Sequence, residues 1–406
     1  MTVLIIGGGG REHALAAAIA KDGVKVFVAP GNAGIAREFD CLSLPNVEAV
    51  LDWCVLNHPK YVVFGPEQPL AEGWADVLEK AGIACVGPSK KAAKIESSKA
   101  FAKDLMAKND IPTASYECFE NPEQARKQIL SQPKYPIVIK ADGLAAGKGV
   151  AVVENEADAV KFLESISGKV VLEEFLEGWE TSLFAITDGE SFKTTLFARD
   201  HKRLMDGDLG PNTGGMGAFC PVPEAEAWRD EIEQRVISPT LDALRELGTP
   251  FKGFLYCGLM ITKEGPKVLE YNCRLGDPET QALLPLLNTP FTEICEAITS
   301  KKVHELKLEW SQESSVCVVL SSQGYPGSFS TGHQINFSKE IKSLIRYGGV
   351  AEKAGELVTS GGRVLSLVAL GKNLATARER VYHDIEAVEF LGKHFRGDIA
   401  LPRNEL

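Results

Sequence analysis

The chain has 406 residues, of which 44% are hydrophobic and 24% charged, a composition typical of a globular protein with several domains. Its 55 acidic residues outnumber its 44 basic ones, and the formal net charge of −11 argues against broad nucleic-acid binding. No apolar run approaches the roughly 20 residues of a membrane span, and the nine cysteines stand singly. We therefore expect a cytoplasmic protein with reduced thiols, no secretion signal, and neither a membrane nor a nucleic-acid partner.

Residues 1–98 alternate between strand and helix signals. The β-rich segments are VLIIG, VKVFVA, YVVFG and IACVG, and helical segments such as EHALAAAIA and LAEGWADVLEKA lie between them. This alternation predicts a parallel sheet with helices on both faces, and hence an α/β fold that begins with a Rossmann-like domain.

The first strand runs into GGGGRE, a glycine-rich turn before a helix. Gly7 and Gly9 fit the dinucleotide pattern G-x-G-x-x-G, but Glu12 stands where the third glycine belongs. A dinucleotide site also needs an acidic residue at the end of the second strand, where this chain has Ala29 and Pro30. The turn therefore favours the phosphate of another small ligand, with a plain tight turn and a dinucleotide site as the alternatives.

Residues 113–181 carry the signals of a small α+β unit. Its segment IKADGLAAGKGV is not a Walker A motif, but it offers Lys140 on a strand and Lys148 on a glycine loop. Such a loop can close over phosphates and exclude water, and a solvated hairpin is the alternative. The segment VVLEEFLEGWETS follows, with Glu173, Glu174 and Glu180 as possible acceptors for ribose hydroxyls or as an acidic surface turn.

The segment KVLEYNCRLGDPETQ predicts a strand in which alternate residues share a face. Glu270, Asn272 and Arg274 then point one way, and this set of hard oxygen ligands with a planar cation suits Mg²⁺ and phosphate. An exposed polar edge is the alternative. Before this strand, residues 206–219 form a glycine-rich stretch that we expect to be a long functional loop. Residues 306–406 read as a small α/β cap.

These motifs, in this order, resemble the ATP-grasp ligases and, more closely, the phosphoribosylamine–glycine ligase (glycinamide ribonucleotide synthetase) family. The resemblance implies an N-terminal substrate-binding domain at 1–98, an ATP-grasp domain at 99–305 with a lid at about 113–181, and a C-terminal α/β domain at 306–406. It runs through nearly the whole chain, in GGGGREHALA, APGNAG, FGPEQPL, GPSKKAAKIESSKAFAKD, VIKADGLAAGKGV, EEFLEGWETS, DHKR, GPNTGGMGAF, GFLYCGLMI, EYNCRLGDPETQ and TSGGRVL.

The resemblance implies an enzyme of de novo purine (IMP) synthesis. ATP, glycine and 5-phosphoribosylamine would give glycinamide ribonucleotide, ADP and phosphate through a glycyl phosphate intermediate. We expect a monomer. Another ATP-grasp ligase, an NAD-dependent oxidoreductase and a non-catalytic nucleotide sensor are the competing interpretations.

The resemblance also assigns a role to individual residues of this chain. Those implied to bind ATP are Lys99, Lys140, Lys148, Glu173, Phe175, Leu176 and Glu180. The implied ligands of Mg²⁺ or Mn²⁺ are Glu270 and Asn272, and the implied catalytic residues are Arg274, Asp200 and Lys148. Those implied to contact phosphoribosylamine or glycine are Gly9, Gly10, Glu67, Asn212, Thr213, Gly214, Gly215 and Arg363. The segment GFLYCGLMI lacks the second metal carboxylate of many ATP-grasp enzymes, which favours a single metal.

Overall fold

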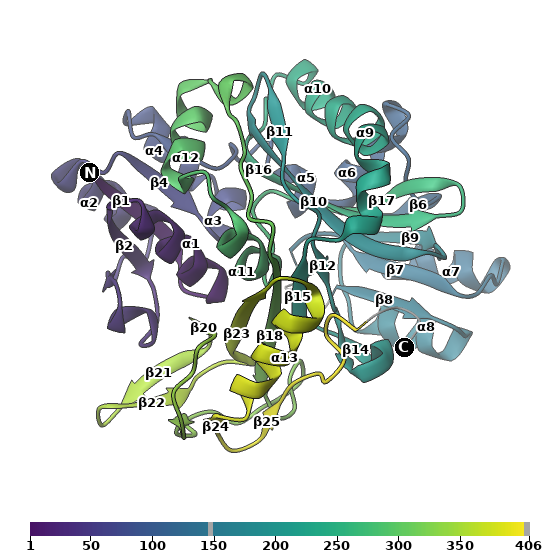
Figure 1. Ribbon diagram of the computed structural model, residues 1–406. Helices are drawn as coiled ribbons and strands as arrows, with labels where there is room; N and C mark the ends of the chain where they lie inside the picture. Colours follow the sequence, from purple (N-terminus) through teal and green to yellow (C-terminus); the bar gives the residue numbers. More distant parts are fainter. Residues whose placement is uncertain (145–148, 402–406) are drawn as a thin grey trace.

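A computed structural model describes residues 1–144 and 149–401 (Figure 1). Its N-terminal part is a parallel sheet, as the alternating pattern predicts, with β1 at the centre and buried residues from Val3 to Gly7. The strands lie in the order β3 (Asp40–Cys41), β2 (Lys25–Pro30), β1 (Thr2–Gly7), β4 (Tyr61–Phe64) and β5 (Cys85–Val86). The accompanying helices are α1 (Gly10–Lys21), η1 (Ile35–Arg37), α2 (Val47–Asn57), α3 (Glu67–Glu72) and α4 (Trp74–Lys80).

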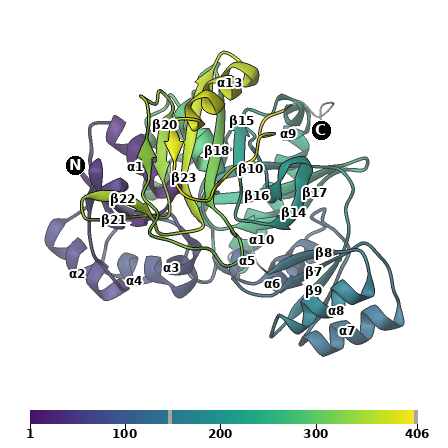
Figure 2. The same cartoon turned by 90° about the horizontal axis from the view of Figure 1, so that it is seen from below.

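A four-stranded antiparallel sheet forms a separate unit at one end of the molecule (Figure 2). Its strands lie in the order β6 (Tyr116–Phe119), β9 (Val170–Glu174), β7 (Ile137–Ala141) and β8 (Val150–Val153), with α7 (Pro122–Ser131) and α8 (Glu156–Glu164) packed beside them. The unit has a small hydrophobic core of its own, which includes Ile139, Val170 and Leu172. It is connected to the N-terminal part through α5 (Lys94–Ser97) and α6 (Lys99–Lys108).

A second antiparallel sheet faces this unit and ends at the polar segment singled out in the sequence. Its strands lie in the order β11 (Phe192–Thr194), β10 (Trp179–Asp188), β16 (Lys252–Thr262) and β17 (Gly265–Asn272). Its covering helices are η3 (Pro223–Trp228), α9 (Arg229–Ile232), η4 (Glu233–Ile237) and α10 (Ser238–Glu246).

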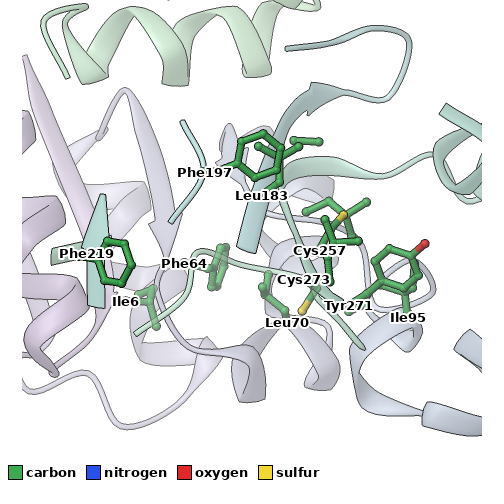
Figure 3. Close-up of a cluster of buried hydrophobic side chains, with 14 of the residues drawn as sticks. Ile6, Phe64, Leu70, Ile95, Leu183, Phe197, Phe219, Cys257, Tyr271 and Cys273 are labelled. Carbon is green, nitrogen blue, oxygen red and sulfur yellow. The ribbon is translucent and has the colours of Figure 1, made fainter. Parts of the chain in front are cut away.

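Strand β17 contains a β-bulge that sets the direction of its side chains. Gly258 pairs with Glu270 and Leu259 pairs with Val268, so Leu269 is the extra residue. Beyond the bulge the side chains alternate as predicted. Tyr271 and Cys273 lie in a large buried cluster with Cys257, Ile95 and Leu70 (Figure 3), while Glu270 and Asn272 stay partly accessible.

The third large sheet is built from two distant stretches of the chain. Its strands lie in the order β12 (Arg199–Asp200), β15 (Gly217–Cys220), β18 (Ser314–Ser322), β23 (Arg363–Gly371) and β20 (Leu344–Tyr347), and β25 (Lys393–His394) pairs with β18. Helix α13 (Leu374–Ile385) packs on β18 and β23. The remaining elements of this half are α11 (Glu279–Leu283), η5 (Leu284–Leu286), α12 (Phe291–Ser300), η6 (Val303–Glu305), β19 (Asn336–Phe337), β21 (Val350–Lys353), β22 (Glu356–Thr359) and β24 (Val388–Glu389).

The prediction of a long loop at 206–219 is wrong in that the segment contains regular secondary structure. The segment contains η2 (Asp206–Asp208) and then β14 (Leu209–Asn212), which forms a hairpin with β13 (Arg203–Met205), followed by the buried strand β15. Because β15 pairs with β18, the third sheet crosses the boundary expected at 305/306. The exact division into three domains stays a prediction. Among the described residues, no helix is long and apolar enough to cross a membrane.

Candidate active site

The polar end of β17 brings together groups from three parts of the chain. Arg274 donates to Glu67 at 3.1 Å, to Glu96 at 3.0 Å and to the side-chain oxygen of Asn272 at 3.3 Å. Glu96 also accepts from the backbone N–H of Cys273 at 2.7 Å. Two carboxylates therefore fix the guanidinium beside Asn272, in the position that the alternating strand predicts.

The carboxylate of Glu270 interacts electrostatically with three lysines. Its carboxylate is 3.9 Å from the Nζ of Lys202. Burial alone would raise the pKa of Glu270, but the charges of Lys202, Lys140 and Lys99 outweigh it and hold the pKa below its usual value. The carboxylate is therefore ionised and available as a metal ligand.

Lys140 connects the small unit to β17. Its Nζ lies 2.8 Å from Glu173 and donates to the carbonyl oxygen of Leu269 at 2.9 Å. Glu173 is only 3% exposed and also pairs with Lys103 at 2.9 Å. The carboxylate of Glu173 is thus held by two lysines, whereas the resemblance places this residue at the adenine.

Lys202 bridges two carboxylates of the candidate site. Its Nζ lies 2.8 Å from Glu180, in addition to the contact with Glu270. Burial would lower the pKa of Lys202, but Asp200 and Glu180 raise it well above its usual value, so the ammonium is charged. Burial raises the pKa of the neighbouring Asp200, and Lys202 opposes that shift.

Lys99 lies at the N-terminus of α6, against the start of the glycine loop. Its Nζ donates to the carbonyl oxygen of Gly143 at 2.8 Å, and Ser98 donates to Asp142 beside it. Burial lowers the pKa of Lys99, and Glu270 opposes that shift. Lys148, predicted on the same loop, lies outside the described residues.

The donor set at β17 fits a hard divalent cation. Glu270 and Asn272 supply a carboxylate and an amide oxygen, and Mg²⁺ commonly takes one or two protein oxygens together with phosphate oxygens and water. Gly258 stands opposite Glu270 on β16, so that position of the neighbouring strand adds no carboxylate. Within residues 1–144 and 149–401, no group of three His, Cys, Asp or Glu could hold a metal ion by itself.

Two cavities are lined by residues of the candidate site. One, of about 500 Å³, is lined by Phe175 and Leu176 of the link after β9, together with Trp179, Trp228 and the tip of the β16–β17 hairpin. Glu173 and Glu180 do not line it. Of the residues predicted to bind the adenosine of ATP, Phe175 and Leu176 thus line this cavity. Glu173 and Glu180 instead pair with Lys140 and Lys202. We call Lys99, Lys140 and Lys202 around Glu270 the lysine cluster.

The second cavity, of about 280 Å³, lies where the N-terminal glycines meet the third sheet. It brings together three predicted substrate residues, Gly9, Gly10 and Arg363, whereas Glu67 is bound to Arg274 outside it. The full lining is Gly8, Gly9, Gly10, Asp277, Gln281, Val319, Arg346, Gly348, Gly349, Arg363, Leu365 and Ser366.

The predicted segment 212–215 contacts Arg363 of this second cavity. Asn212 ends β14, and Thr213 donates to the carbonyl oxygen of Lys202 at 2.8 Å. Gly214 accepts from Arg363 at 2.5 Å and donates to the hydroxyl of Tyr325 at 2.8 Å. Gly215 follows with its N–H bonded to Thr213. The segment therefore connects Lys202 of the lysine cluster with Arg363.

Glu12 explains why the opening glycines do not fit a dinucleotide. Its carboxylate accepts from the N–H of Gly9 and from Arg11, both at 2.5 Å. A Cβ on Gly7 would lie 2.6 Å from the Glu12 side chain, so this side chain occupies the space above the turn. The helix N-terminus is thus partly capped by the chain itself.

Four residues that the sequence analysis did not place in the site take part in it. Lys202, Glu96 and Lys103 form ion pairs with residues that are distant in the sequence, and Arg346 lines the second cavity. Lys202 lies within the motif DHKR, and Glu96 and Lys103 lie within GPSKKAAKIESSKAFAKD, whereas Arg346 lies in none of the motifs that carry the resemblance.

The comparisons with known proteins agree with this architecture. Family models of phosphoribosylglycinamide synthetase match residues 1–96 (N domain), 97–280 (ATP-grasp domain) and 315–402 (C domain). A biotin carboxylase structure from Campylobacter jejuni shares the fold, with a TM-score of 0.72 at 15% identity over 97% of this chain and 92% of that one. The fold and the lysine–carboxylate cluster thus define an ATP-grasp protein.

More similar relatives narrow the class to one family. A phosphoribosylamine–glycine ligase from Caldanaerobacter subterraneus is 46% identical over 98% of this chain and 99% of its own length. The crystal structure of the Thermotoga maritima phosphoribosylamine–glycine ligase superposes with a TM-score of 0.86 at 38% identity, covering 98% of this chain and all of that one. The chain belongs to the phosphoribosylamine–glycine ligase family.

Proposed function

We propose that the protein ligates glycine to 5-phosphoribosylamine, with ATP converted to ADP and phosphate, in purine biosynthesis. The supporting observation is the cluster of Lys99, Lys140 and Lys202 around Glu270 in a chain that the family models match almost from end to end. Segment 212–215 contacts both the cluster, through Thr213 and Lys202, and the cavity of about 280 Å³ lined by Gly8, Gly9 and Gly10, through Gly214 and Arg363. We call this cavity the glycine cavity. This arrangement suits a reaction in which a triphosphate drives the joining of two further substrates.

The proposed chemistry follows from the poor reactivity of a carboxylate. A glycine carboxylate oxygen attacks the γ-phosphorus of ATP, and the bond to the β,γ-bridging oxygen breaks to release ADP. The amine of phosphoribosylamine then attacks the carbonyl carbon of glycyl phosphate, phosphate leaves and the amine loses a proton. Positioning and charge neutralisation are the main tasks of the protein.

The residues of the cluster match these tasks. Lys99, Lys140, Lys148 and Arg274 would neutralise phosphate oxygens, and Glu270 with Asn272 would hold Mg²⁺ or Mn²⁺, which supplies further charge neutralisation at the phosphates. Phe175 and Leu176 would line the adenine, and Glu180 would accept from its ribose. Asp200 and residues 212–215 would place glycine and the amine. The small unit β6–β9 would exclude water from the acyl phosphate.

A coupled ADP-release assay tests this function. We expect ADP release only when ATP, glycine, phosphoribosylamine and Mg²⁺ or Mn²⁺ are all present, and a loss of release when any one is omitted. Release that depends on bicarbonate in place of glycine would contradict the proposal and favour another ATP-grasp ligase. Binding of a nicotinamide dinucleotide would favour the oxidoreductase interpretation.

We further propose a cytoplasmic monomer with one protein-bound metal site and no nucleic-acid partner. The single carboxylate at the end of β17 supports one metal, and the net charge of −11 supports the absence of nucleic acid. Light scattering of the purified chain should give the mass of one copy, and a dimer mass would contradict this part.

A further inference from the structure

Two arginines of the third sheet line the glycine cavity, and they differ in what neutralises them. Arg363 donates to the carbonyl oxygens of Gly214 and Asp277 and lies 3.2 Å from the carboxylate of Asp277. The charge of Arg363 is therefore already neutralised by Asp277. Arg363 positions segment 212–215 against Asp277 and offers little charge to a ligand.

Arg346 has no such partner. It is 9% exposed on β20, and its guanidinium donates to the carbonyl oxygen of its neighbour Ile345 at 3.1 Å. Among the described residues, its Nε has no hydrogen-bond partner and no carboxylate lies within 4.0 Å of its side-chain nitrogens. A buried charge without a partner is costly, so the cavity needs an anion from outside the chain.

A second polar group in the cavity also has no partner. Gln281, 1% exposed, donates through its Nε2 to Asp277 at 2.7 Å, which directs the Oε1 the other way. Among the described residues, no donor reaches that Oε1. The cavity therefore combines a cation without a counter-ion and an acceptor without a donor, which a phosphorylated sugar would satisfy through its phosphate and a hydroxyl.

The start of α1 forms another part of the cavity lining. Backbone N–H groups in the first turn of a helix have no acceptor within the helix, and they favour an anion. Here the carboxylate of Glu12 accepts from the N–H of Gly9, so the remaining N–H groups of the first turn are available to a ligand. A Cβ on Gly10 would lie 2.9 Å from Gln281 Nε2, so only glycine brings this backbone so close to Gln281.

We propose that Arg346 binds the 5-phosphate of the ribosylamine and selects the phosphorylated amine over the unphosphorylated one, with Gln281 accepting a ribose hydroxyl. The inference rests on the proposed function for the name of the sugar, but the anion site rests on the cavity alone. The titratable groups near Arg346 are Glu38 and His13 of the N-terminal part, which bond to each other at 3.2 Å, and the buried thiol of Cys317. Among the described residues, none of the three forms an ion pair with Arg346.

Substrate discrimination measures the role of Arg346. Phosphoribosylamine is generated from ribose 5-phosphate and ammonia, and ribosylamine from ribose and ammonia. We expect Arg346→Met to raise the KM for phosphoribosylamine by about 30-fold or more, since bonds to a charged partner are lost. The KM values for ATP and glycine should stay within about twofold of those of the native protein. Activity with ribosylamine should be equally low in both proteins.

Two further variants separate binding from folding. Arg346→Lys keeps the charge and should recover part of the affinity, while Arg380→Met, an exposed arginine on α13 of the same half, should leave the KM unchanged. Thermal unfolding of all three should be cooperative. An Arg346→Met protein that folds and keeps the native KM and the native preference for the phosphorylated amine would overturn the proposal.

Calorimetric titration with ribose 5-phosphate keeps this test independent of the reaction. We expect binding to the native protein and at least about tenfold weaker binding to Arg346→Met. If the native protein bound this sugar phosphate through Arg346 but released no ADP with glycine, the proposed function would fail and the anion site would stand. Equal binding to both proteins would remove the anion site whatever the activity.

Discussion

Glu270 concentrates the electrostatics of the candidate site in one side chain. Its ionised carboxylate balances Lys202, Lys140 and Lys99, and it is the one carboxylate among the proposed metal ligands. We expect Glu270→Ala to lower glycine-dependent ADP formation by about three orders of magnitude, because metal binding and the balance of charge are both lost. The coupled ADP assay at saturating Mg²⁺ measures this change.

The matched control for Glu270→Ala is the same substitution at Glu174. The carboxylate of Glu174 accepts from the backbone N–H of Ser115 at the edge of the small unit. Glu174→Ala should leave the activity within a few-fold, and both variants should unfold cooperatively. Full activity of Glu270→Ala would refute the metal assignment. A loss of folding in that variant alone would assign Glu270 a structural role.

At this scale the sequence predicted residue types better than residue partners. The strand period was enough to place Glu270, Asn272 and Arg274 on one side, because alternation is a local property. The contacts of Glu96 with Arg274 and of Lys103 with Glu173 join residues about 180 and 70 positions apart, so no local pattern marks them. The resemblance implies that Glu173 lies at the adenine, and its carboxylate pairs with Lys103 and Lys140.

At the scale of elements, Asp188 shows how one carboxylate fixes the turn from β10 to β11. One of its oxygens accepts from the N–H groups of Glu190 and Ser191, and the other accepts from Val303 of η6. Burial would raise the pKa of Asp188, but these backbone hydrogen bonds outweigh it and lower the pKa below its usual value of 3.8. The folded state therefore favours the ionised form.

Replacing Asp188 by Asn should lower the free energy of unfolding by about 1–2 kcal/mol at pH 7, since the amide presents its NH₂ to one of the backbone donors. Because the folded pKa lies below the unfolded one, the contribution of the carboxylate is complete above about pH 4–5 and is lost as the pH falls through the folded value. Urea unfolding at pH 7, 5 and 3.5 should show the difference between native and variant shrinking at the lowest pH. A difference that stayed constant would contradict the role of the charge.

Element prediction failed where pairing over long distances overrode composition. Residues 206–219 read as a loop because of their glycines, but Gly217–Cys220 form a buried strand through pairing with β18, about 100 residues further along. The sequence analysis does not predict helix α2, because the apolar residues of this helix do not form a clear stripe along one face. Its N-cap, Asn46, accepts from the N–H of Ala49 and is the local signal that was available.

At the scale of the whole molecule, the order of motifs predicted the architecture but not how its parts interlock. The glycine cavity takes its walls from α1, from the RLGDPETQ segment and from the last third of the chain. Both views place β20 on the side of α1, and the two elements are in contact (Figures 1 and 2). No part alone encloses the cavity, so its shape depends on the contacts between parts.

Asn32 forms hydrogen bonds to two of these parts of the chain. Its side-chain NH₂ donates to the carbonyl oxygen of Gly8 at 2.8 Å and to those of Tyr347 and Gly348 at 3.0 Å, while its oxygen accepts from Gly34 and Ile35. Gly8 and Gly348 both line the glycine cavity. One amide thus holds together the two halves of the proposed phosphate site.

We therefore expect Asn32→Ala to raise the KM for phosphoribosylamine by about tenfold and to lower the free energy of unfolding by about 1–3 kcal/mol, because three partly buried carbonyl groups lose their donor. The KM for ATP should not change, since Asn32 contacts no residue of the lysine cluster. Asn46→Ala removes the cap of α2 at an exposed position, so it should cost about 1 kcal/mol of stability with no change in any KM. If Asn32→Ala matched Asn46→Ala in both measurements, Asn32 would be a local turn residue and the two walls of the cavity would be held together by other contacts.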